Sequence, residues 1–213
     1  MASTKKRRGK VPKELTVNQK KITELAKDAW ALTLKEFYFP PLNEPNYVFD
    51  YTHLEGFYID PENKWQITMN LANTPLFKED QEYIDYFHSI SLHEVSHYEI
   101  IPYDGLIHAK LLGAAMKHVN QNYAPIIVNV FADLIIDTKL YEKYPNLITW
   151  EVKSTYKHIK EKGPMSNFTK FLFRAYEKLW GIDISEDDSL KEMDSLTEKV
   201  TRTILKDFED EST

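Results

Sequence analysis

Core-facing residues recur at helical spacing in the N-terminal part of the chain. From Leu15 onward they stand three and four positions apart, at Ile22, Leu25, Ala26, Ala29, Trp30 and Thr33. This period predicts an amphipathic helix. The helix should end before the proline-rich stretch FPPLNEPN, which we predict to be a loop.

The pattern then changes to one that is typical of strands. The stretch YVFDYTHLEGFYIDPENKWQITMN is dense in aromatic and β-branched residues, and it is interrupted by the proline-containing turn DPENK. Turns of this kind join the strands of a hairpin. We therefore predict two antiparallel strands, at about residues 56–59 and 65–69.

Helical spacing returns after the sequence ANTP. One face is formed by Tyr83, Phe87, Ile90, Glu94, His97 and Ile101, and Pro102 ends the run. The pattern predicts a helix of about 20 residues. Its last two turns contain the sequence SISLHEVSHYEI.

Further helices are predicted in the C-terminal half. One covers about residues 106–119, and the next begins near Pro125, which suits a first-turn position, and stops before Pro145. The segments NFTKFLFRAYEKLW and SLKEMDSLTEKVTRTILKDF predict two more amphipathic helices, separated by an acidic loop. The order of elements predicts an α+β fold with a small antiparallel sheet and a mainly helical C-terminal part.

The length of the chain favours one main domain. The 213 residues are 42% hydrophobic and 13% aromatic, which is enough for one sizeable core with room for an appendage. We predict a disordered basic tail over residues 1–12, a main domain over residues 13–165 and a helical extension over residues 166–213. The extension is expected to pack on the same domain, although it could also present a surface to a partner.

Charge and cysteine content narrow the classes of function. The formal net charge is −6, with a basic KKRRGK near the start and an acidic DISEDDSLKEMD near the end. This balance argues against a dedicated nucleic-acid-binding protein, although the basic tail could make a weak, salt-dependent contact with phosphates. The chain has no cysteine, which excludes disulfides, thiolate zinc sites and cysteine nucleophiles. Any metal must be held by His, Asp, Glu or water.

Targeting signals are not evident in the sequence. No stretch approaches the roughly 18 apolar residues of a membrane span. The basic start is followed by neither the apolar core nor the small-residue cleavage site of a signal peptide. We therefore expect a cytoplasmic protein that has no membrane partner.

The sequence HEVSH carries the first candidate chemistry, with His93 and His97 four residues apart and Glu94 between them. Side chains at this spacing project from the same face of a helix, so both imidazoles can bind one zinc ion while Glu94 lies beside it. Zinc lowers the pKa of a bound water toward about 7, and Glu94 would take the proton as that water attacks a carbonyl. This chemistry is that of a zinc-dependent peptidase acting on proteins or peptides. The alternative is a helix that carries two histidines by chance.

A third metal ligand is expected in the segment PIIVNVFADLIID. After its proline, apolar residues cover every face of the predicted helix except at Asn129, Asp133 and Asp137, which are spaced four apart. Such a helix should be largely buried, and an unpaired buried carboxylate costs several kcal/mol. These acids should therefore meet a metal, or else Lys, Arg or backbone donors. We predict Asp133 as the third ligand and Asp137 as the alternative; Asn129 or Asp137 could instead orient His93 or His97.

At these residues the chain resembles the zincin metallopeptidases, in particular the gluzincin-like branch in which an acid on a later helix completes the H-E-x-x-H site. The segment NVFADLIID is also similar to the N-x-x-x-D-x-x-x-N helix of predicted metallopeptidase domains that often accompany von Willebrand A modules. The resemblance covers about residues 55–145.

The resemblance implies a zincin-like α+β fold in which His93 and His97 bind zinc, Glu94 acts as general base and Asp133 binds the metal or supports a ligand. One position departs from the family pattern. Gluzincins of the E-x-x-A-D type carry a glutamate ligand where this chain has Asn129, and an amide is a poorer zinc ligand than a carboxylate.

Four other residues are candidates for parts of a site. Tyr98 and Tyr103 follow the motif and could donate a hydrogen bond to an oxyanion, although we favour a packing role for both. His108 and His118 are ten residues apart, so they do not share a helix face and cannot form a second histidine pair. We regard His108 as a spare ligand and His118 as a surface residue. The alternative function is a non-catalytic adaptor or DNA-associated regulator of zincin fold.

Overall fold

The computed structural model describes residues 14–52, 56–60, 66–102 and 104–211, without the side chains of residues 58–60 and 207–211. In chain order its elements are α1 (Val17–Glu36), β1 (Asn46–Val48), β2 (Phe57–Asp60), β3 (Gln66–Asn70), α2 (Asp80–Glu99), α3 (Gly105–Ala115), α4 (Ala124–Lys143), α5 (Pro145–Lys162), α6 (Asn167–Trp180) and α7 (Asp194–Glu211), with short 3-10 helices at Leu71–Asn73 and Asp188–Met193. The predicted tail over residues 1–12 and most of the predicted turn DPENK lie outside the described residues.

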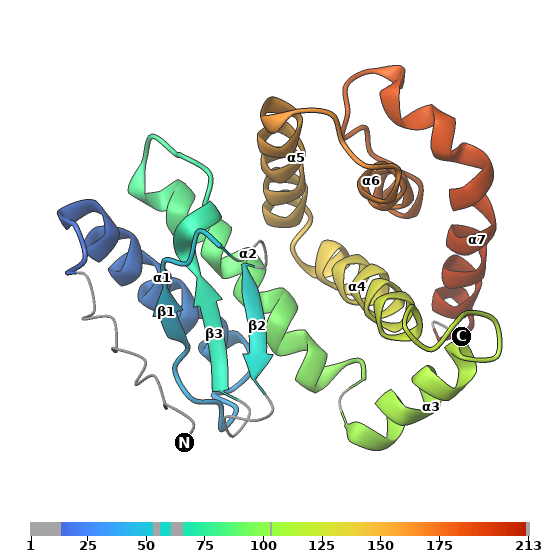
Figure 1. Cartoon of the computed structure of the whole chain (residues 1–213), viewed down its shortest axis with the longest axis horizontal. Coiled ribbons are helices and arrows are strands. Elements are labelled where there is room, and N and C mark those ends of the chain that lie inside the picture. The colour runs from blue at the N-terminus through green and yellow to red at the C-terminus, as the bar shows by residue number, and fades with distance from the viewer. Residues whose placement is uncertain (1–13, 53–55, 61–65, 103, 212–213) are drawn as a thin grey trace, which may run out of the picture.

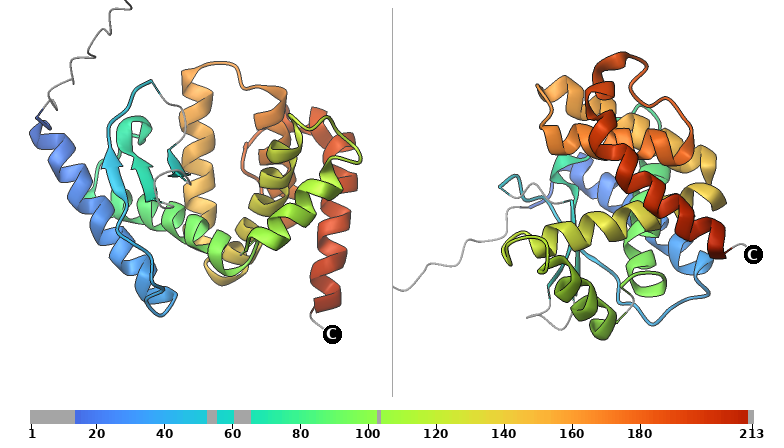
Figure 2. Two further views of the ribbon diagram at one scale, coloured as in Figure 1. Left: turned by 60° about the horizontal axis from the view of Figure 1, so that its bottom comes forward. Right: turned by 90° about the vertical axis from the view of Figure 1, so that its right-hand side faces the viewer.

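The elements form two parts that lie side by side (Figure 1). The first contains the small sheet with α1 and α2, and the second contains α4, α5, α6 and α7. The left-hand view of Figure 2, from another direction, shows the same division. Helix α2 packs against both α4 and α5 and so connects the two parts.

Helix α1 forms as its periodicity predicts. Thr16 caps the first turn together with Gln19 in a reciprocal capping box, which satisfies backbone N–H groups that have no partner within the helix. The six core-facing residues of the predicted stripe are all buried: Ile22, Leu25, Ala26, Ala29, Trp30 and Thr33. They pack mainly against α2, so that prediction is confirmed.

The sheet is mixed, and the prediction of a purely antiparallel sheet was wrong. β2 pairs with β3 in antiparallel orientation, with Phe57 opposite Met69. On the other side of β3, β1 runs parallel to it, with Asn46 opposite Thr68. β1 could not be predicted, because three residues are too few to display a two-residue period. Met69 packs with residues of α1 and α2 in one apolar cluster, which fixes the sheet on these helices.

Helix α2 has the predicted length but buries a different face. Its buried residues are Phe87, Ser89, Ser91, Leu92, Val95 and Ser96. The predicted face did not include the serines, whereas Ser96 donates its hydroxyl to the carbonyl of Leu92 and is fully buried. Small side chains on this face allow α1 to approach closely. As a consequence, His93, Glu94 and His97 are only half-buried.

Helix α4 runs through the second part and contacts α2, α3, α5 and α6. Val128, Ala132, Leu134, Ile136 and Leu140 are buried, as expected for an apolar helix. The expectation of burial on every side was wrong for the first turns, because Ile126 and Ile127 remain about half exposed.

Helix α5 was not predicted from the sequence. Pro145 was interpreted only as the end of the preceding helix, but it also occupies the first turn of α5, where proline is well tolerated. Ile148, Val152 and Tyr156 follow at four-residue spacing and are buried in the main core cluster. Across the described residues, no helix combines the length and apolar character needed to cross a membrane.

Candidate metal centre

The end of α2 and the middle of α4 bring three potential metal ligands together. His93 and His97 lie one turn apart on α2, and Asp133 faces them from α4. The Nε2 atoms of the two imidazoles are 3.2 Å apart. Asp133 Oδ1 lies 3.5 Å from Nε2 of His93 and 3.4 Å from Nε2 of His97. The predicted set of His93, His97 and Asp133 therefore converges on one point.

The triangle formed by these atoms has the size of one face of a zinc coordination sphere. With zinc–ligand bonds of about 2.0–2.1 Å and tetrahedral angles, neighbouring ligand atoms lie about 3.3–3.4 Å apart. The three measured distances of 3.2, 3.4 and 3.5 Å bracket this value. Two imidazole nitrogens and one carboxylate oxygen are also ligands that zinc accepts. The residues present thus fit this metal in both geometry and chemistry.

Hydrogen bonds on the far side of each ring fix the histidine tautomers. His93 Nδ1 lies 2.5 Å from Asp137 Oδ1, and His97 Nδ1 lies 3.1 Å from the carbonyl oxygen of Ile101. An ionised carboxylate and a carbonyl oxygen can only accept, so both Nδ1 atoms carry the hydrogen. The two Nε2 atoms of the neutral rings therefore direct lone pairs toward each other and toward Asp133. These lone pairs and the carboxylate repel one another unless a cation or a proton lies between them.

The carboxylate of Asp133 is held in the same manner. Its Oδ2 accepts a hydrogen bond of 2.8 Å from Nδ2 of Asn129, one turn earlier on α4. Its Oδ1, which faces the imidazoles, is buried and has no hydrogen-bond partner among the described residues. Asn129 therefore orients Asp133, whereas the sequence suggested that it orients a histidine. Asp137 supports His93 from the Nδ1 side and does not join the ligand triangle.

The charges within the cluster shift the pKa values of its members. Burial disfavours a charged His93, but Asp137 and Asp133 outweigh burial and hold the pKa of His93 well above its ordinary value. Burial likewise disfavours a charged Asp133, but the contacts with His93 and His97 lower the pKa of Asp133. The site therefore favours a positive charge at its centre. A proton on His93 can supply it, and so can a metal ion.

Glu94 lies beside the triangle and contributes no atom to it. Its carboxylate has no hydrogen-bond partner in the described part of the chain. Burial raises the pKa of Glu94, while the nearby His93 and His97 act in the opposite direction. A half-buried carboxylate close to His93 and His97 is suitably located for exchanging protons with a molecule bound at the cluster.

Several groups near the site were missed by sequence reasoning. Tyr176 on α6 donates its hydroxyl hydrogen to Asp137 Oδ2, and the carbonyl of Ile101 holds His97. Glu151 on the unpredicted helix α5 lies close enough for Asp137 and His93 to influence its pKa. A backbone carbonyl carries no sequence signal. Tyr176 is separated from Asp137 by 39 positions, and no local pattern links the two.

The remaining residues that the sequence raised do not join the cluster. Tyr98 is half-buried near Glu94, where burial raises its pKa. Tyr103 lies outside the described residues, and His108 and His118 are exposed. Comparison with protein-family models, with curated proteins and with solved structures gave no match. What the site can do therefore has to be argued from its own atoms.

Proposed function

We propose that this chain is a zinc-dependent metallopeptidase of zincin-like arrangement. The observation that carries the proposal is the triangle of His93 Nε2, His97 Nε2 and Asp133 Oδ1, with edges of 3.2 to 3.5 Å. The polar atom that each of these side chains turns away from the triangle already has a hydrogen-bond partner. Ligands held from behind in this way are typical of metal sites.

The ligand count favours a catalytic site over a purely structural one. Structural zinc sites are closed by four protein ligands, whereas catalytic sites use three and leave one position open. The described residues supply three. The side chains of His93, His97 and Asp133 are 22%, 17% and 21% exposed, so each reaches the surface in part, while the ligand atom Asp133 Oδ1 is buried.

Within this proposal each residue has a distinct role. His93, His97 and Asp133 would hold zinc, which when bound acidifies water and polarises a carbonyl. Glu94 would accept a proton from the attacking water and return it to the leaving amine. Among the described residues its carboxylate has no hydrogen-bond partner, which supports this role because a carboxylate engaged elsewhere would not be available.

The alternative is a non-catalytic protein with the same fold that acts as an adaptor or a DNA-associated regulator. A structural metal site needs no general base, so the presence of Glu94 beside the cluster favours the enzyme. The same two-histidine, one-carboxylate set also suits iron(II), which makes identification of the metal part of the test.

The experiment compares wild type with three variants for metal content and for cleavage of unfolded casein. We expect one zinc per chain in the wild type and in Glu94→Gln, with cleavage by Glu94→Gln reduced by about 100-fold or more. His97→Ala should lose both metal and activity. Glu99→Gln changes an exposed glutamate on the same helix and should keep both.

The possible outcomes separate the alternatives. The proposal would be contradicted if the wild-type protein, purified without chelator and then supplied with zinc, contained no metal. Stoichiometric zinc without cleavage would favour the non-catalytic alternative. Stoichiometric iron would move the site to a different class of chemistry.

A further inference from the structure

Helix α6 reaches the candidate metal centre through one side chain. The hydroxyl of Tyr176 donates a hydrogen bond to Asp137 Oδ2, while Asp137 Oδ1 faces Nδ1 of His93 at 2.5 Å. The two oxygens of one carboxylate thus connect a tyrosine of α6 with a histidine of α2. This connection places a residue of the C-terminal helices two hydrogen bonds away from the ligand triangle.

The packing around Tyr176 leaves its hydroxyl little freedom. Its ring is buried and stacks on Trp180, with ring centres 4.6 Å apart. Trp180 in turn stacks on Tyr141 and donates its indole N–H to the hydroxyl of Thr138 at 3.2 Å. Tyr141 and Thr138 belong to α4, and Thr138 directly follows Asp137. Helix α6 is therefore anchored on α4 at the very position where Tyr176 meets Asp137.

We propose that Tyr176 is a positioning residue for the metal centre. Its hydrogen bond fixes the rotation of the Asp137 carboxylate, so that Oδ1 stays directed at His93 Nδ1. That contact in turn holds the His93 tautomer and ring orientation in which Nε2 points into the triangle. The inference rests on the metal binding of the proposed function but not on peptidase activity. It assigns the C-terminal helices to the metal centre, beyond a role in covering the core.

A purely structural role for Tyr176 is the competing explanation, and a double-mutant cycle separates the two. Tyr176→Phe keeps the ring and its stacking but removes the hydroxyl. Asp137→Ala removes the group through which the hydroxyl is proposed to act. If the effect passes through Asp137, the tyrosine substitution should have no further effect once Asp137 is absent.

The readout is zinc affinity, measured by competition with a chromophoric chelator at fixed pH. Loss of a direct partner of a metal-bound histidine typically costs 10- to 100-fold, so we expect a loss in that range for Asp137→Ala. The hydroxyl removed in Tyr176→Phe is one hydrogen bond further from the metal, so the zinc affinity of this variant should fall by about three- to tenfold. The double variant should match Asp137→Ala alone. Tyr156→Phe is the matched control, because its buried hydroxyl meets Ser189 outside the metal centre and its removal should leave zinc affinity unchanged.

Two results would overturn the inference while leaving the proposed function intact: an unchanged zinc affinity in Tyr176→Phe, or an equal loss with and without Asp137. A wild type that binds no zinc would overturn both. Should Tyr176→Phe prove too unstable to titrate, Asp137→Asn provides a second test. The amide oxygen of the asparagine can accept a hydrogen bond from His93 or from Tyr176, and the NH₂ group can accept from neither. Zinc affinity should therefore fall, and an unchanged value would contradict the inference.

Discussion

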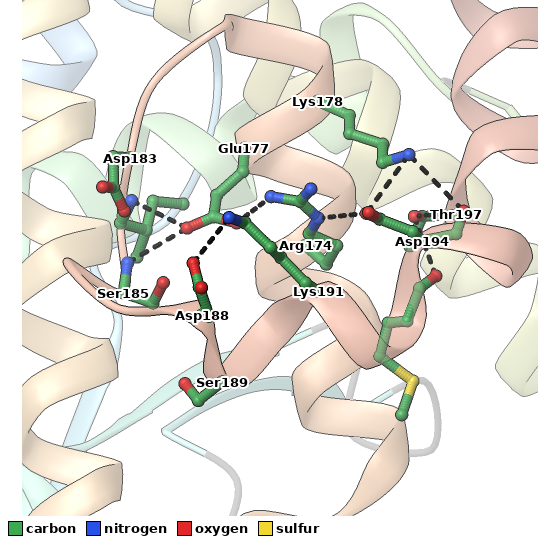
Figure 3. A network of polar contacts seen from close by, with 12 residues as sticks. Arg174, Glu177, Lys178, Asp183, Ser185, Asp188, Ser189, Lys191, Asp194 and Thr197 are labelled. Atoms are coloured by element: carbon green, nitrogen blue, oxygen red, sulfur yellow. Dashed lines mark hydrogen bonds and ion pairs between the residues drawn. The ribbon is translucent and has the colours of Figure 1, made fainter.

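Two clusters of charged side chains in this protein compensate the charge of their carboxylates in different ways. In the C-terminal cluster, Arg174 bonds to both Asp194 and Glu177, at 2.6 and 2.7 Å (Figure 3). The other oxygen of Glu177 accepts the backbone N–H groups of Ile184 and Ser185. Each of these carboxylates thus meets a cation or N–H donors supplied by the chain itself.

Lysine and arginine side chains of the described residues supply no such cation to the metal centre. Among the described residues, Asp133 and Asp137 meet histidines, an amide and a tyrosine hydroxyl, but no lysine or arginine. Buried carboxylates need a compensating charge. The comparison teaches that an acidic cluster that contains its own arginine serves the fold, whereas one that faces imidazole lone pairs could hold a cation from outside, as the proposed function requires.

The largest effect on stability is expected from a substitution that breaks the C-terminal cluster. Glu177→Ala removes a buried carboxylate, leaves Arg174 with one partner fewer and strands two buried N–H groups. We expect a loss of about 3–5 kcal/mol in the free energy of unfolding, measured by urea denaturation.

Glu186→Ala is the control for this substitution. Glu186 lies in the loop after α6 that also contains Ile184 and Ser185, but it is largely exposed, and its replacement should change stability by less than about 0.5 kcal/mol. Zinc affinity should be retained in any folded Glu177→Ala protein. Equal stability of the two variants would show that the cluster is not a structural one.

The next effect concerns Glu151, a carboxyl that has neither an internal cation nor a place in the metal triangle. It accepts a hydrogen bond from Thr155, and burial raises its pKa to about 7. Between the unfolded value of 4.5 and about 7, the folded state therefore binds more protons, so stability falls as pH rises through this window. In metal-free protein Glu151→Gln should be more stable than wild type at pH 8, by up to about 3 kcal/mol, and no more stable at pH 4.

Thermal or urea unfolding across this pH range checks the Glu151 prediction. Glu161→Gln changes an exposed glutamate of the same helix and should follow the wild-type curve. A Glu151→Gln curve parallel to wild type at every pH would mean that Glu151 titrates as an ordinary surface acid.

The smallest effect is expected from replacing Asn129, which holds the third ligand Asp133. Asn129→Ala removes the amide that holds Asp133 Oδ2, so the carboxylate can rotate away from the imidazoles. We expect zinc affinity to fall by about tenfold, at the low end of the range for groups that support a ligand. Chelator competition measures this loss, with the exposed Asn122→Ala as control. A wild-type affinity in Asn129→Ala would indicate that Asp133 is held by packing alone.

The sequence predicted those parts of the site that depend on local periodicity. His93 and His97 share a helix face because they are four residues apart, and Asp133 stood out because its neighbours are apolar. Tyr176 could not be found in this way, since its contact with Asp137 depends on how α6 packs across α4. Helix α5 was missed because a proline that ends one helix also begins the next. On α2, the hydroxyl of Ser96 donates to a carbonyl of its own helix, so a polar residue that the predicted face did not include fits the core.

The central claim is that an external cation completes the cluster of His93, His97 and Asp133. X-ray absorption spectroscopy at the zinc edge of the zinc-loaded protein tests it most directly. The predicted result is one zinc per chain, bound by two imidazole nitrogens and by oxygen at about 2.0–2.1 Å. His97→Ala should bind too little zinc to give this spectrum. A protein that binds no zinc, or a zinc site whose spectrum lacks imidazole, would contradict the claim.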